Sequence, residues 1–295
     1  MTGAARVAVV GPGAVGATMA AAVRRAGCDV MLCGRTPHER LVVEREGGAT
    51  EIVAGPVLID PAALTGGAVD FALVAVKAHQ TEAAAPWLRA LCGERTVVLV
   101  LQNGVEQRAL VGPHAHGAAV VPAVVWSPSE VTSPGRVRVR DDPRLTLPAE
   151  PAARAVAALF DGSGVQIDLA DDYATQAWRK LAINAVAALM VLAGRRAAIF
   201  RRDDIQPLAR ALALECLAVA RAEGADLPDA VADELMTEFE AMPEDLGTSM
   251  LFDREAGRAL EWEARNGVVV RRGAVHGVPT PVSDVIVPLL AAASG

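Results

Sequence analysis

Lys180 and Asn184 are the two residues of this sequence best suited to acid–base chemistry on a carbonyl group. They lie in the segment Trp178–Asn184, which reads WRKLAIN. Because they are four residues apart, they share one face if the segment is helical. An ammonium group can then protonate the oxygen of a carbonyl that receives hydride, and an amide one turn further on can orient the substrate. The alternative for a lone lysine is a solvated helix face.

Two further polar motifs each follow an apolar run. The motif VKAHQ, with Lys77, comes after a run that begins at Phe71, and LQNG, with Asn103, comes after a run that begins at Thr96. If both runs are parallel strands, the motifs lie at their carboxyl ends, where open α/β sheets bind ligands. His79 in the first motif could relay protons, because histidine titrates near neutrality.

A glycine-rich motif opens the chain and fits the dinucleotide-binding pattern G-x-G-x-x-G. It directly follows the apolar run Arg6–Val10 and precedes an Ala-rich segment of helical composition, which is the context that this fingerprint requires. The phosphates of a dinucleotide would then lie at a helix N-terminus. The motif consists of Gly11, Pro12, Gly13, Ala14, Val15 and Gly16.

The residue that follows the second predicted strand favours NADP over NAD. NAD-binding proteins usually carry Asp or Glu at this place for the ribose 2′-hydroxyl. Here the segment Asp29–Cys33 is followed by Gly34 and Arg35. The planar guanidinium of Arg35 can pair with a 2′-phosphate. The alternative is a surface arginine, with NAD bound in another way.

Positioning these motifs requires a parallel sheet with crossover helices. Apolar runs at 6–10, 29–33, 71–76 and 96–101 predict strands, and 14–25 and 81–91 predict helices between them. Short β-like runs at 118–126, 136–140, 145–147 and 165–168 are interpreted as the far half of the same sheet, with one more helix over 151–160.

The second part of the chain is predicted to be entirely helical. Helices are expected over 171–192, 203–223, 228–241, 246–272 and 281–293. We therefore predict an α/β fold: an N-terminal Rossmann-type doubly wound sheet with a C-terminal all-helical domain. The predicted domains are residues 1–169, which bind NADP, and residues 170–295, which carry the substrate and catalytic residues.

Composition narrows the class of protein further. The net charge of −7, without a long basic block, argues against nucleic acid as a main partner. The longest apolar run, Ala185–Ala193, is too short to span a membrane, and no signal peptide is expected. The four cysteines form no CxxC pair, which favours a reducing cytoplasm. His114 and His116 lack the third ligand of a zinc site, and no metal is expected.

Taken in order along the chain, the motifs resemble those of the ketopantoate reductase (2-dehydropantoate 2-reductase) family. The resemblance runs nearly end to end and rests on short segments whose order and spacing are together specific. They are GPGAVG, Arg35, VKAHQ, LQNG, WRKLAIN, Gly247-Thr248-Ser249-Met250 with Asp253, Glu261 with Asn266-Gly267, and His276–Pro281.

The resemblance implies NADPH-dependent reduction of a 2-oxo acid, most directly ketopantoate to pantoate. By resemblance, Lys180 is the general acid, and Asn184 and Ser249 bind the substrate. Asn103 contacts the cofactor near its nicotinamide, and Lys77 lies where cofactor and substrate meet. Glu261 hydrogen-bonds the substrate or the cofactor ribose.

One position departs from the family pattern and leaves the substrate open. The family often has a second Asn one turn beyond the first, where this chain has Ala188. Losing one hydrogen-bond partner can cost roughly 1–3 kcal/mol, so the chemistry can persist while the substrate differs. His79 also stands where the family often has another residue.

Two alternatives remain beside this interpretation. One is a related Rossmann oxidoreductase, such as a β-hydroxyacid dehydrogenase, which also pairs a Lys with an Asn at i+4. Ser249, Glu261 and the QNG motif argue against it. The other is a non-catalytic NADP sensor, which the presence of both Lys180 and Asn184 disfavours. The Ala- and Leu-rich helical half is compatible with a homodimer but does not establish one.

Overall fold

The computed structural model describes residues 3–294 and divides into two compact units. The first consists of the chain up to Gln102 together with Glu106–Tyr173. The second consists of Asn103–Val105 together with the chain from Ala174 onward. The functional division of the chain at residue 170 stays a prediction. The short segment that holds Asn103 nevertheless packs with the helical unit, although the sequence on both sides of it belongs to the first.

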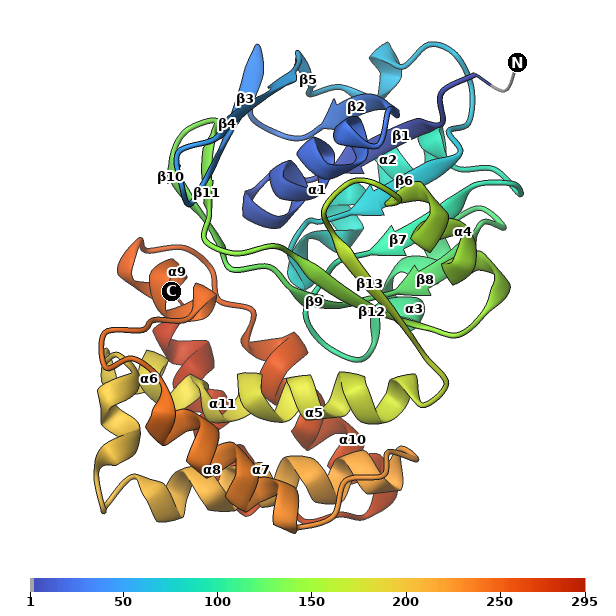
Figure 1. Cartoon of the computed structure of the whole chain (residues 1–295). Coiled ribbons are helices and arrows are strands. Elements are labelled where there is room, and N and C mark those ends of the chain that lie inside the picture. Colours follow the sequence, from blue (N-terminus) through green and yellow to red (C-terminus); the bar gives the residue numbers. More distant parts are fainter. Residues whose placement is uncertain (1–2, 295) are drawn as a thin grey trace. The chain divides into compact units, whose positions relative to one another are not determined.

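A six-stranded parallel sheet forms the centre of the first unit (Figure 1). Its strand order is β5-β2-β1-β6-β7-β8, and every neighbouring pair is parallel. The strands are β1 (Arg6–Val10), β2 (Asp29–Cys33), β5 (Val57–Leu58), β6 (Phe71–Val74), β7 (Val97–Val100) and β8 (Ala119–Pro122). The strand order reverses beside β1, which marks the ligand-binding edge of such sheets. The predicted doubly wound Rossmann-type sheet is confirmed.

Apolar side chains on alternate positions of these strands face opposite layers of helices. Val7 and Val9 of β1 belong to one core cluster with α1 (Ala14–Arg25) and α4 (Pro151–Leu159). Ala8 and Val10 belong to a second cluster on the other face. That face is covered by α2 (Thr81–Leu91) and α3 (Gln107–Val111). Burial on both faces explains why the strands read as continuous apolar runs.

The segment between residues 118 and 168 was predicted as the far half of the main sheet, and this is wrong for all but β8. A four-stranded sheet has the order β10-β11-β3-β4, and a three-stranded sheet has the order β13-β12-β9. The strands are β3 (Arg40–Arg45), β4 (Thr50–Ala54), β9 (Val124–Trp126), β10 (Ser129–Ser133), β11 (Arg136–Val139), β12 (Arg144–Pro148) and β13 (Gln166–Ala170). β11 alternates exposed Arg with buried Val, so it needs cover on one face only and cannot serve as a fully buried strand.

Helix α1 provides that cover. It contacts β3, β4, β10 and β11 on one side and the main sheet on the other. Eight consecutive residues of the helix, from Gly16 to Val23, are buried. Their small size explains how one helix can lie between two sheets. The Ala-rich composition of this segment therefore has a structural cause.

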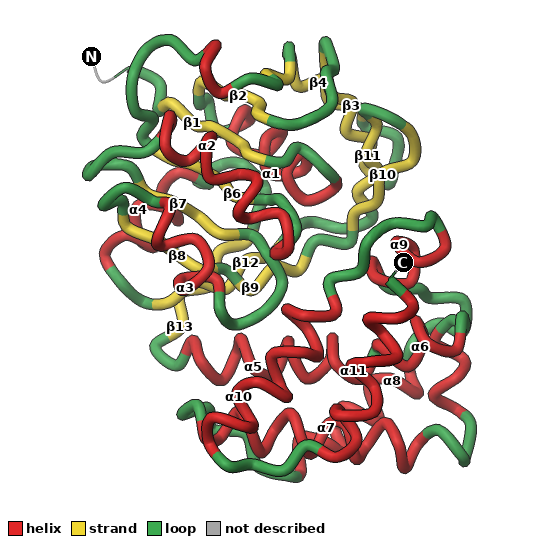
Figure 2. Tube along the Cα trace, turned by 180° about the vertical axis from the view of Figure 1, so that it is seen from behind, coloured by secondary structure: helices red, strands yellow, loops and turns green. Residues whose placement is uncertain are grey.

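In the second unit only helices are found among the residues that the structure describes (Figure 2). They are α5 (Tyr173–Val186), α6 (Ala188–Ala193), α7 (Gln206–Ala222), α8 (Ala230–Ala241), α9 (Ser249–Glu255), a π-helical turn η5 (Glu263–Gly267), α10 (Val268–His276) and α11 (Pro281–Ala293). Short 3₁₀ segments along the chain are η1 (Pro61–Ala63), η2 (Ala78–Gln80), η3 (Gly112–His114) and η4 (Ala197–Arg201). The predicted all-helical C-terminal part is confirmed.

Two of the predicted helices are interrupted, which corrects their bounds. The helix expected over 171–192 is split at Ala187 into α5 and α6. The helix expected over 246–272 ends at Glu255, and Gly257 follows with a positive φ of 62°. A left-handed residue ends a helix in this way. No helix within residues 3–294 is long and apolar enough to cross a membrane.

Candidate active site

Two of the three glycines after β1 are required by the packing of the chain itself. Gly11 has φ 91°, and a Cβ on it would lie 2.7 Å from the backbone nitrogen of Val76. A Cβ on Gly16 would collide with the carbonyl oxygen of Gly11. Both glycines are therefore required by the packing of β1 and α1 against the loop that follows β6.

Gly13 differs, because the protein itself does not require it. Its φ is −76°, which any residue can adopt, and a Cβ built on it meets no atom within 4 Å. A missing side chain at an unstrained, open position leaves room for something outside the chain. Because Gly13 is also the N-cap of the twelve-residue helix α1, that room lies at a helix N-terminus, which favours a phosphate. The loop therefore fits the pyrophosphate of a dinucleotide.

Arg35 lies in the loop that follows β2, next to this glycine loop. A Cβ on Gly34 would lie 3.1 Å from Cδ of Pro12, so the two loops are in contact. Arg35 is exposed and makes no ion pair within residues 3–294. An unpaired guanidinium beside the glycine loop is suited to pairing with a phosphate group.

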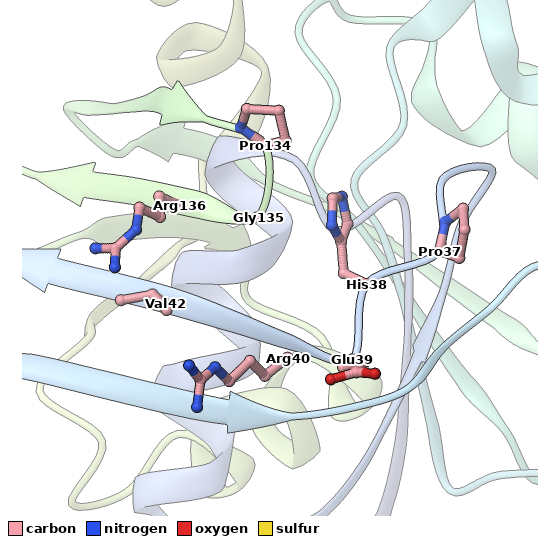
Figure 3. Close-up of a pocket in the computed structure, with 8 residues that line it drawn as sticks. All are labelled: Pro37, His38, Glu39, Arg40, Val42, Pro134, Gly135 and Arg136. Carbon is pink, nitrogen blue, oxygen red and sulfur yellow. The ribbon is translucent and has the colours of Figure 1, made fainter.

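A pocket of about 360 Å³ lies further along the same connection, and sequence reasoning did not predict it (Figure 3). Its lining comes from the connection between β2 and β3, from β3 itself and from the turn between β10 and β11, and consists of Pro37, His38, Glu39, Arg40, Val42, Pro134, Gly135 and Arg136. Arg136 forms an ion pair with Glu44. This pocket could not be predicted from the sequence, because the two strand pairs that frame it were not predicted as a separate sheet.

Lys77 follows the carboxyl end of β6, as the sequence predicted. β6 pairs with β1, and Lys77 is the half-buried N-cap of η2. His79, two residues on, is exposed. At the end of β7, Gln102 is 3% exposed and donates to Thr81 Oγ1 at 2.8 Å, while its carbonyl accepts from Gln107 Nε2 at 3.2 Å. These bonds fix the loop after β7, in which Asn103 is the next residue.

In the second unit, α5 carries Lys180 and Asn184 one turn apart. Lys180 is half-buried, and Asn184 is 9% exposed. The side-chain amide of Asn184 has no hydrogen-bond partner in the part of the chain that the structure describes. Its amide atoms are not closed off from solvent, so they can both donate to and accept from a polar substrate group.

Three more of the predicted residues meet in one partly buried hydrogen-bond network of this unit. Asn103 Nδ2 donates to Glu261 Oε2 at 3.2 Å. Arg265 Nη2 donates to Ser249 Oγ at 2.9 Å and lies 3.5 Å from Glu261 Oε2. Asn266 Nδ2 donates to the carbonyl of Ala185 at 3.1 Å, which joins the turn η5 to α5 directly beside Asn184. The structure thus links Asn103, Ser249 and Glu261 through a residue that sequence reasoning missed.

That residue is Arg265, which is 3% exposed and lies in the π-helical turn η5. π-helical turns are rare, and those that occur often lie at functional sites. The cue in the sequence is an arginine four residues after Glu261, a spacing that is also typical of an exposed ion pair on a regular helix. The sequence alone therefore predicts a regular helix here and does not distinguish Arg265.

Gly104 fixes the loop that carries Asn103 against the same turn. It has φ 108°, and a Cβ on it would lie 3.1 Å from the carbonyl oxygen of Ala264. We expect Gly104→Ala to lower the free energy of unfolding by about 1–2 kcal/mol and to lower kcat/KM by about tenfold, because Asn103 is displaced from Glu261. Thermal unfolding and steady-state kinetics check both effects. Gly112→Ala, whose Cβ would meet nothing within 4 Å, is the control. Equal kinetics in the two variants would contradict the positioning role.

Lysine is scarce in this chain, and both lysines lie in the predicted motifs. Only two of the 28 Lys and Arg residues are lysines, Lys77 and Lys180. An arginine keeps its proton throughout the pH range of folded proteins, whereas a lysine can give it up. A chain that uses arginine elsewhere and lysine at these two positions fits a requirement for a transferable proton or for a compact cation there.

Ala188 lies where the family pattern often has Asn. It is fully buried at the start of α6, within the apolar core of the helical unit. This position therefore supplies no polar group to a substrate.

A dinucleotide-type glycine loop on a parallel sheet, followed by a helical unit that carries Lys180 and Asn184 one turn apart, defines a Rossmann-type oxidoreductase. Two family models match the chain: "Ketopantoate reductase PanE/ApbA" over residues 7–151 and its C-terminal counterpart over residues 172–294. The 2-dehydropantoate 2-reductase of Mycobacterium tuberculosis (strain H37Rv) is 53% identical over 98% of this chain and 97% of its own. The 2-dehydropantoate 2-reductase of Caulobacter vibrioides is 42% identical over 98% of this chain and 99% of its own.

A solved structure gives the same result. The dimeric ketopantoate reductase of Staphylococcus aureus superposes with a TM-score of 0.89 at 28% identity and covers 98% of both chains. The chain belongs to the ketopantoate reductase family.

Proposed function

We propose that this chain catalyses the reduction of ketopantoate to pantoate, with NADPH as the hydride donor. Membership of the family and the 53% identity to a 2-dehydropantoate 2-reductase support the reaction. The observation that carries it within the chain itself is the side-chain amide of Asn184, one turn from Lys180, which makes no hydrogen bond to residues 3–294 and can therefore bind a ligand. This pair offers a carbonyl substrate both a proton donor and an orienting group.

The cofactor is expected to bind with its pyrophosphate at Gly11–Gly16 and its 2′-phosphate at Arg35. The open position at Gly13 and the unpaired guanidinium of Arg35 support this choice. When bound, NADPH supplies the hydride that adds to the carbonyl carbon. Lys77, at the end of β6, is expected to contact the cofactor and the substrate with its compact positive charge.

Lys180 is expected to complete the reaction by protonating the oxygen. Addition of hydride to a carbonyl places negative charge on this atom, and a nearby ammonium stabilises the charge and then supplies the proton. The product is an alcohol, and Lys180 regains its proton from solvent. Asn184 is expected to hold the substrate by hydrogen bonds, so that the oxygen remains within reach of the ammonium.

Asn103, Ser249 and Glu261 are expected to bind the remaining polar groups of substrate and cofactor. Their hydrogen-bonded network supports a shared role, because each side chain is held by a neighbour and needs little reordering when a ligand binds. Glu261 can accept a hydrogen bond from a hydroxyl, Asn103 lies next to it for the cofactor, and Ser249 offers a hydroxyl to the acid group.

The test is oxidation of NADPH by the purified chain with ketopantoate and, in parallel, with other 2-oxo acids. Saturable turnover that is strongest with ketopantoate supports the proposal and shows that Ala188 is tolerated. NADPH binding combined with faster turnover of another oxo acid would overturn the substrate but keep the chemistry. NADPH binding without turnover of any oxo acid would favour a sensor.

A homodimer in a reducing cytoplasm is the setting that we expect. The S. aureus relative is dimeric, and in this chain Val285 and Leu289 are exposed one turn apart on α11. All four cysteines are free, and burial raises the pKa of Cys33 to about 12 and of Cys92 to about 11, which keeps these thiols protonated. Light scattering should give twice the mass of one chain. The mass of a single chain at micromolar concentration would contradict the dimer.

A further inference from the structure

We infer that Arg265 supplies the positive counter-charge for the substrate carboxylate, which it holds through Ser249, and so determines the preference of this chain for an anionic substrate. The inference rests on the proposed function, because it assigns the anionic group of that substrate to a particular pair of residues. Neither the glycine loop nor the Lys–Asn pair accounts for such a group. Arg265 is 3% exposed and belongs to the same network as Asn103 and Glu261.

The guanidinium of Arg265 has more donors than the protein uses. It carries five N–H groups, and the hydrogen bonds it forms all come from Nη2. Its Nε is buried without a partner, and Nη1 forms no hydrogen bond to any part of residues 3–294. Nε is closed off from solvent, so a ligand can reach this charge at Nη1 or through Ser249.

Glu261 forms a buried ion pair with Arg265, but the pair is long. Glu261 lies 3.5 Å from Nη2, at the limit of a hydrogen bond, whereas charge-assisted pairs usually lie at about 2.7–2.9 Å. Glu261 also accepts from Asn103 at 3.2 Å. The carboxylate thus offsets part of the charge from one side, and Nε and Nη1 keep donor capacity that no acceptor uses.

Ser249 gives this charge a point of contact with a ligand. Arg265 can only donate, so in the 2.9 Å bond Ser249 Oγ must be the acceptor. The hydroxyl proton of Ser249 is then directed elsewhere, and Ser249 is exposed, whereas Arg265 behind it is buried. An exposed O–H that must donate, backed by a buried cation, selects an acceptor that carries negative charge. A carboxylate has this chemistry, and an amide or an alcohol does not.

The pair also offers a reason why Ala188 can be tolerated. A substrate held at its carboxylate by a charge-assisted contact depends less on a further neutral amide. Specificity in this chain would therefore rest on the charge of the substrate more than on a second asparagine.

The experiment compares two substrates of nearly the same size: ketopantoate and the uncharged ketopantoamide, in which a primary amide replaces the carboxylate. For the unmutated chain we expect kcat/KM to favour ketopantoate by about 100-fold. In Arg265→Gln that preference should fall by about 10- to 100-fold, with kcat/KM for the amide nearly unchanged. Arg265→Lys, which keeps the charge, should retain most of the preference. Arg210→Gln, which removes an exposed arginine paired with Asp233, is the matched control and should behave like the unmutated chain.

A merely structural role for Arg265 predicts a different result. If Arg265 only holds Ser249 and Glu261 in place, Arg265→Gln lowers kcat/KM for both substrates by the same factor, and the inference is overturned. Ser249→Ala covers the case in which Arg265→Gln does not fold, because Ser249 is exposed. An unchanged preference in Ser249→Ala would also overturn the inference. Failure of the proposed function is distinguishable, since it shows as absence of ketopantoate turnover in the unmutated chain.

Discussion

Replacing Lys180 by Ala is expected to lower turnover by 100-fold or more and to leave the Kd for NADPH unchanged. The expected loss is that of a general acid, which typically contributes about 10²–10⁴-fold. NADPH affinity should persist, because the glycine loop and Arg35 belong to the other unit and do not depend on Lys180. Single-turnover oxidation of NADPH measures the chemical step, and quenching or enhancement of NADPH fluorescence measures the binding.

Two further variants separate proton donation from charge. Lys180→Arg keeps a positive charge but does not release a proton near neutral pH, so it should remain impaired. Arg179→Ala removes the preceding residue of α5, which forms an ion pair with Glu238 of α8, and should be nearly as active as the unmutated chain. Near-normal turnover in Lys180→Ala would exclude it as the acid and leave Lys77 as the remaining lysine.

The second large effect is expected at Arg35, where Arg35→Glu should change the preference between NADPH and NADH. Removing the cation loses the charge-assisted bonds to the 2′-phosphate, and the new carboxylate repels that phosphate and can accept from a ribose hydroxyl. We expect the ratio of kcat/KM for NADPH to that for NADH to fall by about 100-fold.

The control is Arg24→Glu, which makes the same change of charge at the C-terminal end of α1. Arg24 is exposed in the last turn of that helix, away from its N-terminal glycine loop. If the ratio remains unchanged in Arg35→Glu, the 2′-phosphate contact lies elsewhere. The pocket with His38, Arg40 and Arg136 would then be the next place to mutate.

The sequence allowed the main sheet and the positions of most candidate residues to be predicted, because these features depend on local patterns. A doubly buried strand such as β1 reads as an apolar run, and G-x-G-x-x-G has meaning only between a strand and a helix. Lys77 and Asn103 could be placed for the same reason, since each follows such a strand.

The features that were missed depend on contacts distant in the sequence. β3 and β4 were not predicted, because they are half-exposed strands whose cover is helix α1. The break after Glu255 depends on one left-handed glycine, Gly257, in a segment whose composition is otherwise helical. Arg265 reads as a solvated residue until its burial is known, because a charge at i+4 from a glutamate is typical of an exposed helix face.

The two lysines, one in each unit, make the chain suitable for direct observation of its ionisable amines. Reductive methylation with ¹³C-formaldehyde would label Lys77 and Lys180 as the only side-chain amines. A conventional protein of this size gives a crowded spectrum in such an experiment, whereas this one gives two side-chain signals beside the α-amino group. The protonation of the candidate acid could then be followed by NMR as a function of pH and during ligand binding, and Lys180→Arg would assign the signals.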